Sequence, residues 1–261
     1  MKQIQTLTFG LLFMLASSLA SANPEQLLSH LQHMRLSSIS SMSNFFMFSG
    51  LNADRKYERR MMKDLTFFSE SLTAAQGLVA GGPPGEHIAT IATDWNTYVE
   101  KLTAHQKVVA DMGQIAADES MALGALCNSL SAAIAKAYAD IETTGKPNPK
   151  VAAARSLSIL LQEMTTQYAA SGAVGNAGFH AGEYKRSMAD MSKTFTDDLA
   201  KLSSNARNLN TGLLLDDIDS KWRMLSQSLN SEDGNGVPFL IISYNDRIIH
   251  HLEELESKVS K

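Results

Sequence analysis

Two arginines lie in helical seams and are the first candidates for chemistry. Residues spaced alternately three and four apart share one face of a helix, and one such face carries Leu28, Leu31, Arg35, Ser38, Met42 and Phe45. Arg155 lies in a polar seam with Ser158, Gln162 and Thr165. A buried guanidinium is costly unless it is paired, and it binds carboxylates and oxyanions through bidentate hydrogen bonds. Each arginine is therefore expected to pair with an acid, to reach solvent, or to bind an anion.

Histidines and a methionine near the two ends of the chain form a second candidate site. His30, His33 and Met34 share one helical face, and His250 and His251 come close to them if the chain ends meet in a bundle. Imidazole and thioether groups are ligands for copper or haem iron, although the missing Cys-x-x-Cys-His motif excludes covalent c-type haem. Because histidines at helix ends are commonly solvated, no cofactor is expected, and a haem- or copper-binding bundle is an alternative.

The remaining side chains do not favour an enzyme or a nucleic-acid-binding protein. The sequence lacks a recognisable Ser-His-Asp arrangement, a glycine-rich phosphate loop and a His-Glu-x-x-His motif. Cys127 is the only cysteine, and its apolar neighbours predict a buried, inert thiol. A net charge of −4 without blocks of one sign argues against nucleic acid as a partner.

The candidate residues are carried by a sequence that occurs twice. Residues of the first copy recur 127 positions later and include both tryptophans: Tyr57, Arg59, Met61, Phe68, Leu72, Trp95 and Leu102 match Tyr184, Arg186, Met188, Phe195, Leu199, Trp222 and Leu229. A constant offset of this kind indicates an internal repeat. The aromatic members, Tyr57, Phe68, Trp95, Tyr184, Phe195 and Trp222, are expected to form the core of the repeats. Arg59 and Arg186 are interpreted as capping and packing residues.

Helical periodicity predicts an all-α protein. The expected helices are Pro24–Ser49, Ala53–Val79, Glu86–Met112, Asp118–Glu142, Lys150–Ala170, Glu183–Asn208, a helix around Trp222 that ends near Ser231, and Val237–Lys258. A glycine-rich connector is expected from Ser171 to Gly182. The organisation is repeat 1 at 23–144, a linker at 145–149 and repeat 2 at 150–261, as two tandem antiparallel four-helix bundles or one elongated fused bundle.

The first 22 residues have the features of a secretory signal peptide. Lys2 precedes an apolar run from Leu7 to Leu15, and the small residues that follow end in Ala20-Ser21-Ala22. The run is shorter than the roughly 20 apolar residues of a membrane-spanning helix. Cleavage after Ala22 and a periplasmic or secreted location are therefore expected.

The first helices of the two repeats also correspond, and the whole pattern resembles a known sensory domain. Arg35, Ser38, Ile39 and Phe48 match Arg155, Ser158, Ile159 and Tyr168. The pattern resembles the PilJ-like N-terminal domain of type IV pili methyl-accepting chemotaxis transducers, a periplasmic helical bundle, in two tandem copies. It is similar, more distantly, to the periplasmic bundles of nitrate and nitrite sensor kinases. The family's second arginine is replaced by Ser40 in one copy and by Leu160 in the other.

The resemblance implies a role in signal transduction. In the sensor kinases, arginines of two subunits clamp an anion across a dimer axis, so here Arg35, Ser38, Arg155 and Ser158 would bind a small anion within one duplicated chain. Since no methyl-accepting or kinase region is recognised, the signal would pass to an inner-membrane receptor, a sensor kinase or a cyclase. A homodimer, and a structural or adaptor protein without a small ligand, are alternatives.

Overall fold

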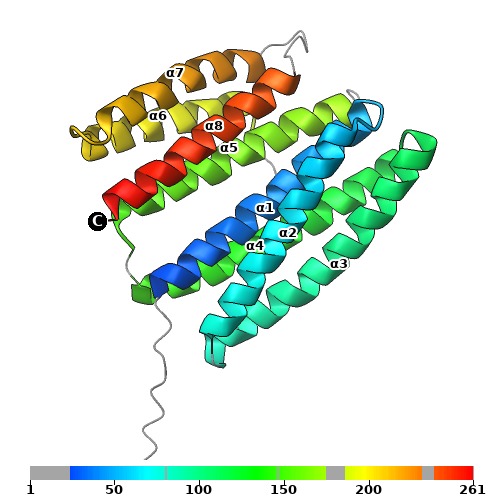
Figure 1. Ribbon diagram of the computed structural model, residues 1–261, viewed down its shortest axis with the longest axis horizontal. Helices are drawn as coiled ribbons and strands as arrows, with labels where there is room; N and C mark the ends of the chain where they lie inside the picture. Colours follow the sequence, from blue (N-terminus) through cyan, green and yellow to red (C-terminus); the bar gives the residue numbers. More distant parts are fainter. Residues whose placement is uncertain (1–23, 80, 146, 175–185, 231–237, 261) are drawn as a thin grey trace, which may run out of the picture.

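The computed structural model describes residues 24–79, 81–145, 147–174, 186–230 and 238–260, and within these ranges the chain forms α-helices and no strand. The helices are α1 (Pro24–Gly50), α2 (Arg55–Leu78), α3 (Gly82–Met112), α4 (Ala117–Gly145), α5 (Pro149–Val174), α6 (Met188–Ala206), α7 (Gly212–Leu229) and α8 (Pro238–Val259) (Figure 1). The predicted all-α fold is confirmed. The predicted signal peptide and Tyr184 lie outside the described residues.

Local sequence signals explain where several helices begin and end. The side chain of Asp54 accepts a hydrogen bond from the Lys56 N–H at the start of α2, as expected of an N-cap. Helix α3 begins at Gly82, four residues before the expected start. Prolines are tolerated in a first helical turn, because the N–H groups that they lack would have no partner there. Helix α5 continues to Val174, so the connector expected from Ser171 onward begins later than predicted.

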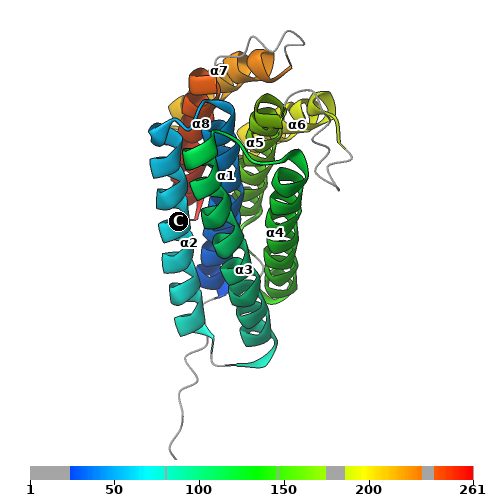
Figure 2. The ribbon, with the colours of Figure 1, turned by 90° about the vertical axis from the view of Figure 1, so that its right-hand side faces the viewer.

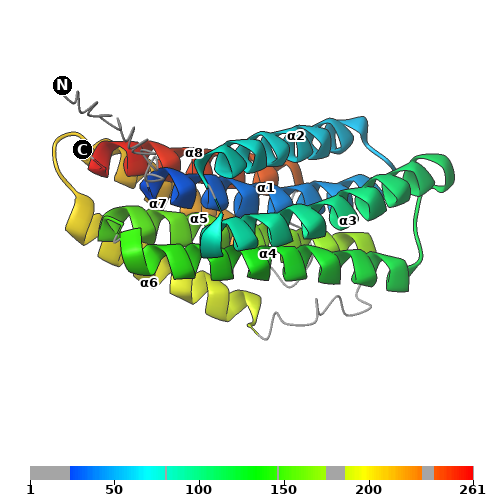
Figure 3. The same cartoon turned by 90° about the horizontal axis from the view of Figure 1, so that it is seen from below.

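Helices α1 and α5 run parallel to each other between the two halves of the chain. Figures 1 and 2 show α2, α3 and α4 grouped with α1, and α6, α7 and α8 grouped with α5. Seen from below, α1 and α5 lie side by side along their length (Figure 3). Near their C-terminal ends, a Cβ atom added to Gly50 would lie 3.0 Å from the Cα of Ala173. The halves therefore lie side by side, and the α1–α5 pair joins them.

Helix α1 is buried around most of its circumference. Seventeen of its 27 residues are buried, and a helix buried on all sides does not need a single apolar stripe. Small serines allow its neighbours to approach closely, and two of their hydroxyls bond to the helix's own carbonyls. The hydroxyl of Ser38 donates to the Arg35 carbonyl at 2.9 Å, and that of Ser41 to the Ser38 carbonyl at 2.7 Å. Polar serines are thus accommodated in the interior.

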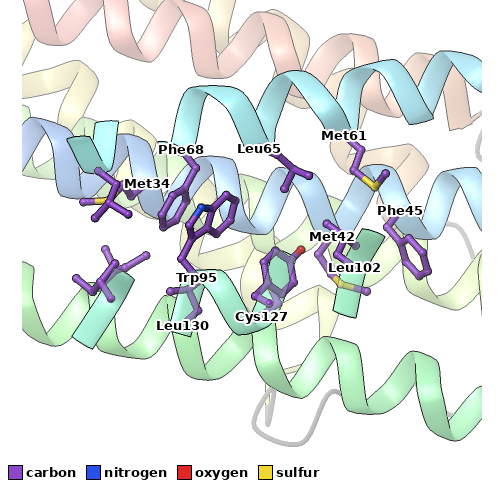
Figure 4. Close-up of a cluster of buried hydrophobic side chains, with 14 of the residues drawn as sticks. Met34, Met42, Phe45, Met61, Leu65, Phe68, Trp95, Leu102, Cys127 and Leu130 are labelled. Atoms are coloured by element: carbon purple, nitrogen blue, oxygen red, sulfur yellow. The ribbon is translucent and has the colours of Figure 1, made fainter. Parts of the chain in front are cut away.

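Each half has its own apolar core with a tryptophan packed on a phenylalanine. Trp95 stacks on Phe68 with ring centroids 3.6 Å apart (Figure 4). Trp222 packs on Phe195 with centroids 4.2 Å apart. Both tryptophans are buried, and so is Tyr57. The phenylalanine–tryptophan pair is therefore buried in both halves, with the ring planes stacked at 7° in the first and tilted at 40° in the second.

Cys127 is buried in the core of the first half, as expected (Figure 4). Its thiol donates a hydrogen bond of 3.4 Å to the carbonyl of Ser38. Burial raises the pKa of this thiol to about 12, which keeps it in the unreactive protonated form.

Among the described helices, none has the length and apolar character needed to cross a bilayer.

We expect Trp95→Ala and Trp222→Ala each to lower the free energy of unfolding by about 3–5 kcal/mol, because each removes a large buried ring and leaves a cavity. Urea unfolding followed by circular dichroism measures the change. Met112→Ala is the control: this side chain is 76% exposed, so a change below about 0.5 kcal/mol is expected. A tryptophan variant as stable as the control would contradict the repeated-core interpretation.

Candidate functional site

Arg155 is a buried cation held by acids from both halves of the chain. Its side chain is 3% exposed. The guanidinium donates to Glu256 of α8 at 2.5 and 3.0 Å, to Glu25 of α1 at 2.6 Å, and to the Tyr138 hydroxyl of α4 at 3.2 Å. Burial alone lowers the pKa of Arg155, but the hydrogen bonds with Glu256 and Tyr138 outweigh it and raise the pKa. The cation is therefore fully engaged within the chain.

Arg35 is paired as well, but it is more accessible. Its Nε donates to the Ser131 hydroxyl of α4 at 3.0 Å, and one of its terminal nitrogens donates to Glu163 of α5 at 3.2 Å. Burial raises the pKa of Glu163, and the charges of Arg35 and Arg186 partly offset this effect. The Arg35 side chain is 28% exposed. It thus passes between α4 and α5 and reaches the surface.

Both arginines line one small cavity between α1, α4 and α5. The cavity has a volume of about 170 Å³ and is also lined by Gln32, Tyr138 and Glu142. The sequence analysis left open whether the arginines pair with acids or clamp an anion, and the structure shows both paired with acids. An oxyanion in this cavity would compete with those carboxylates and would be repelled by Glu142. The geometry therefore gives the small-anion clamp little support.

The two serines predicted to assist the arginines do not reach this cavity. Ser38 is fully buried, and Ser158 is 2% exposed. Their hydroxyls donate to carbonyls of their own helices, that of Ser158 to Ala154 at 3.1 Å. Neither serine is among the residues that line the cavity. The correspondence between the first helices of the two repeats predicted that these serines assist the arginines. In the structure the serine side chains point into the packed interior instead.

The described residues form a larger groove along α5 and α6. Its volume is about 780 Å³, and its lining residues come mainly from these two helices: Arg35, Asn148, Pro149, Lys150, Ala153, Ser156, Leu157, Ile159, Leu160, Glu163, Arg186, Thr194, Asp198, Lys201, Leu202 and Asn205. Helix α5 forms the floor and the antiparallel α6 forms one wall. Arg35 reaches the groove from α1, so this groove involves both halves of the chain.

The groove has a surplus of positive charge. Four cationic and two acidic side chains line it. Arg35 pairs with Glu163, and Lys201 pairs with Asp198 at 2.9 Å. Arg186 donates to the hydroxyl of Thr194 at 2.9 Å, and within the described part of the chain no carboxylate lies within ion-pair distance of Arg186 or Lys150. Two positive charges are thus left to interact with a ligand.

The groove contains residues that the sequence analysis did not select. Arg186 was recognised as the repeat partner of Arg59 but was interpreted as a packing residue, whereas it precedes α6 and lines the groove. Lys150 and Lys201 have no sequence feature that distinguishes them from other surface lysines. One usable signal was present: Glu163 is the only acid in α5, and it is the only charged residue of that helix after Arg155.

The predicted histidine and methionine ligands are dispersed. Met34 is fully buried in the apolar core (Figure 4), and the His33 ring packs on Phe67 with centroids 5.2 Å apart. His251 contacts Asp217 of α7 at 2.7 Å. Burial is the main cause that lowers the pKa of both His30 and His33. Across the described ranges, no group of three or more histidine, cysteine, aspartate and glutamate side chains is placed to hold a metal ion.

A separate polar network connects α1, α2 and α8. Asp64 accepts hydrogen bonds from the Ser40 hydroxyl and the Asn44 amide, both at 2.8 Å. Arg60 donates to Asn44 at 3.1 Å and forms two bonds with Asp246, at 2.7 and 2.8 Å. Burial raises the pKa of Asp64 to about 7, and the two hydrogen bonds only partly oppose this. The network links the two halves, and none of its residues lines the groove.

Comparison with models of protein families, with curated proteins and with solved structures found no match for this chain. The resemblance to the PilJ-like domain therefore stays a prediction from the sequence.

Replacing Arg155 by alanine is expected to lower the free energy of unfolding by about 3–5 kcal/mol, because two carboxylates lose a buried partner. The control is Arg223→Ala, which removes an exposed ion pair with Asp219 on the same helix. This pair is expected to contribute less than about 1 kcal/mol to the free energy of unfolding. Chemical denaturation of both variants measures the difference. Equal effects of the two substitutions would show that the Arg155 cluster does not join the halves.

Asp64 should make stability depend on pH. Its folded pKa of about 7 lies above the ordinary 3.8, so the native state binds this proton more tightly than the unfolded state does. The stabilisation is complete below about pH 4 and is lost as the pH rises towards 7. Relative to the wild type, Asp64→Asn should therefore become more stable between pH 4 and 7, by at most about 4 kcal/mol. Urea unfolding across this range tests it, and a pH-independent difference would contradict it.

Proposed function

We propose that this protein is an exported, non-catalytic binding module that takes an anionic ligand in the groove between α5 and α6 and passes the bound state to a partner protein. The observation that carries the proposal is the groove itself. Its volume of about 780 Å³ falls in the usual range of small-molecule sites, and its cationic side chains outnumber its acids by four to two.

The charge and size of the groove both indicate the kind of ligand. No carboxylate of the described chain lies within ion-pair distance of Lys150 or Arg186, although the charge of Arg186 lowers the pKa of the nearby Glu163. Arg186 can also donate two parallel hydrogen bonds to a carboxylate. A nitrate-sized ion would fill only a small part of this volume, so larger anions with one or more carboxylates fit better.

The position of the groove suggests how binding would be transmitted. Arg35 belongs to α1, and its partner Glu163 belongs to α5, the two helices that join the halves. A ligand that draws Arg35 or Glu163 into new contacts changes the packing of this pair. Packed helices respond by small shifts between alternative arrangements. A receptor, sensor kinase or cyclase that contacts the bundle is the proposed recipient of that shift.

The groove supports binding better than catalysis. Both of its acids are paired with cations, and its lining residues in the described ranges include no histidine, cysteine or tyrosine. It thus lacks the usual general base or activated nucleophile. An adaptor protein without a small ligand is the alternative that the experiment below separates.

A thermal-shift screen of the purified protein at low ionic strength tests the proposal, with nitrate, nitrite, monocarboxylates, dicarboxylates and oligoglutamate as ligands. We expect carboxylates to raise the melting temperature, by about 5 °C at a hundredfold excess over Kd. Added salt should reduce the rise because it screens exposed charges.

Variants locate the site. Arg186→Ala should abolish the rise in melting temperature. Lys193→Ala should retain it, because Lys193 lies on α6 but outside the groove and is 75% exposed. If no anion in the screen shifts the melting temperature, the protein is an adaptor and the ligand-binding proposal is wrong.

A further inference from the structure

Resting on the proposed function, we infer that the ligand of the groove is an extended acidic segment of a polypeptide, bound through carboxylates near both ends of the groove. The argument uses the length of the groove, the distribution of its charges and the character of its middle part.

The groove is long. Lys150 and Glu163 both line it and both belong to α5. A rise of 1.5 Å per residue places them about 20 Å apart along the helix axis. The opposite wall follows α6 from Thr194 to Asn205. A compact anion would therefore contact only one part of the site.

Positive charge is found towards both ends. At the Glu163 end, Arg35 is paired with this carboxylate, and Arg186 is close enough to lower its pKa. The antiparallel α6 places Lys201 towards the other end, where Lys150 begins the floor. Ser192 of α6 contacts Met164 of α5 at 3.8 Å, which fixes the relative register of the two helices. At each end there is thus one cation, Arg186 or Lys150, that no carboxylate of the described residues approaches within ion-pair distance.

The middle of the groove favours a peptide over an alkyl chain. Four of the apolar residues of its lining are already covered by neighbouring side chains: Leu157, Ile159, Leu160 and Leu202 are at most 8% exposed, whereas Ala153 is half-buried and Pro149, at one end, is exposed. A hydrocarbon chain gains about 25 cal/mol per Å² of apolar surface removed from water, so it would gain little from these four side chains. Ser156 and Asn205 instead offer a hydroxyl and an amide group that can bond to peptide N–H and C=O groups.

The groove length sets the spacing of the acids in the peptide. An extended chain advances about 3.3–3.6 Å per residue, and side chains four residues apart lie on the same face of a strand. Two glutamates at this spacing are about 13–14 Å apart at their Cα atoms. The long side chains of Lys150 and Arg186 can cover the remaining distance to each carboxylate.

Isothermal titration calorimetry at low ionic strength with blocked pentapeptides tests the inference. One peptide, Glu-Ser-Ala-Ser-Glu, has separated acids, and its isomer, Glu-Glu-Ser-Ala-Ser, has adjacent acids and the same charge. We expect the separated acids to bind about tenfold more tightly, because only they reach both ends. Lys150→Ala and Arg186→Ala should each remove most of this advantage, and Lys193→Ala, with its exposed side chain outside the groove, should leave it unchanged.

The outcomes separate the two proposals. Equal binding of the isomers, while carboxylates still raise the melting temperature, would overturn the extended-peptide inference and leave an anion-binding groove. An advantage of the separated acids that persists in both groove variants would also overturn it, because the peptide would then bind elsewhere. Absence of binding by every anion and both peptides would remove the proposed function together with the inference.

Discussion

A buried guanidinium is the interaction on which the joining of the two halves depends. Arg155 of α5 binds Glu25 of α1, Tyr138 of α4 and Glu256 of α8, so one cation ties three other helices. A charge buried to this extent is tolerated only when carboxylates and hydroxyls satisfy its donors. The pairing fixes the depth at which α5 lies against α1 and thus positions the residues that line the groove.

The two sides of the α1–α5 pair differ in their charged contacts. On one side, Arg60 of α2 binds Asp246 of α8, and the ammonium of Lys56 lies 4.0 Å from the Phe239 ring centroid. The positions that match Arg60 and Asp64 in the second copy hold Ser187 and Met191, which cannot form the corresponding charged network. The other side holds the groove, where no carboxylate of the described residues lies within ion-pair distance of Arg186 or Lys150. Charged pairs therefore hold the first side together, and the second side leaves a groove.

Helix positions were largely predictable because helical periodicity and turn residues are local signals. The aromatic repeat was informative for a related reason: Phe68 with Trp95 and Phe195 with Trp222 bury large apolar rings, so their spacing is tied to core packing. The groove was not predictable in the same way. Arg186 and Lys150 lie 36 positions apart in the sequence, and neither differs from an ordinary surface cation until the fold places both along α5 and α6.

The sequence by itself determined the all-α fold, the main helix boundaries and the aromatic pairs, because propensity, capping and apolar spacing act over a few residues. Only the tertiary structure decided what Arg35 and Arg155 do. Their partners, Glu163 and Glu256, lie about a hundred or more positions away along the chain. Whether a buried charge pairs with an acid of its own chain or with an external anion depends on which helices pack together. Local sequence patterns do not determine that packing.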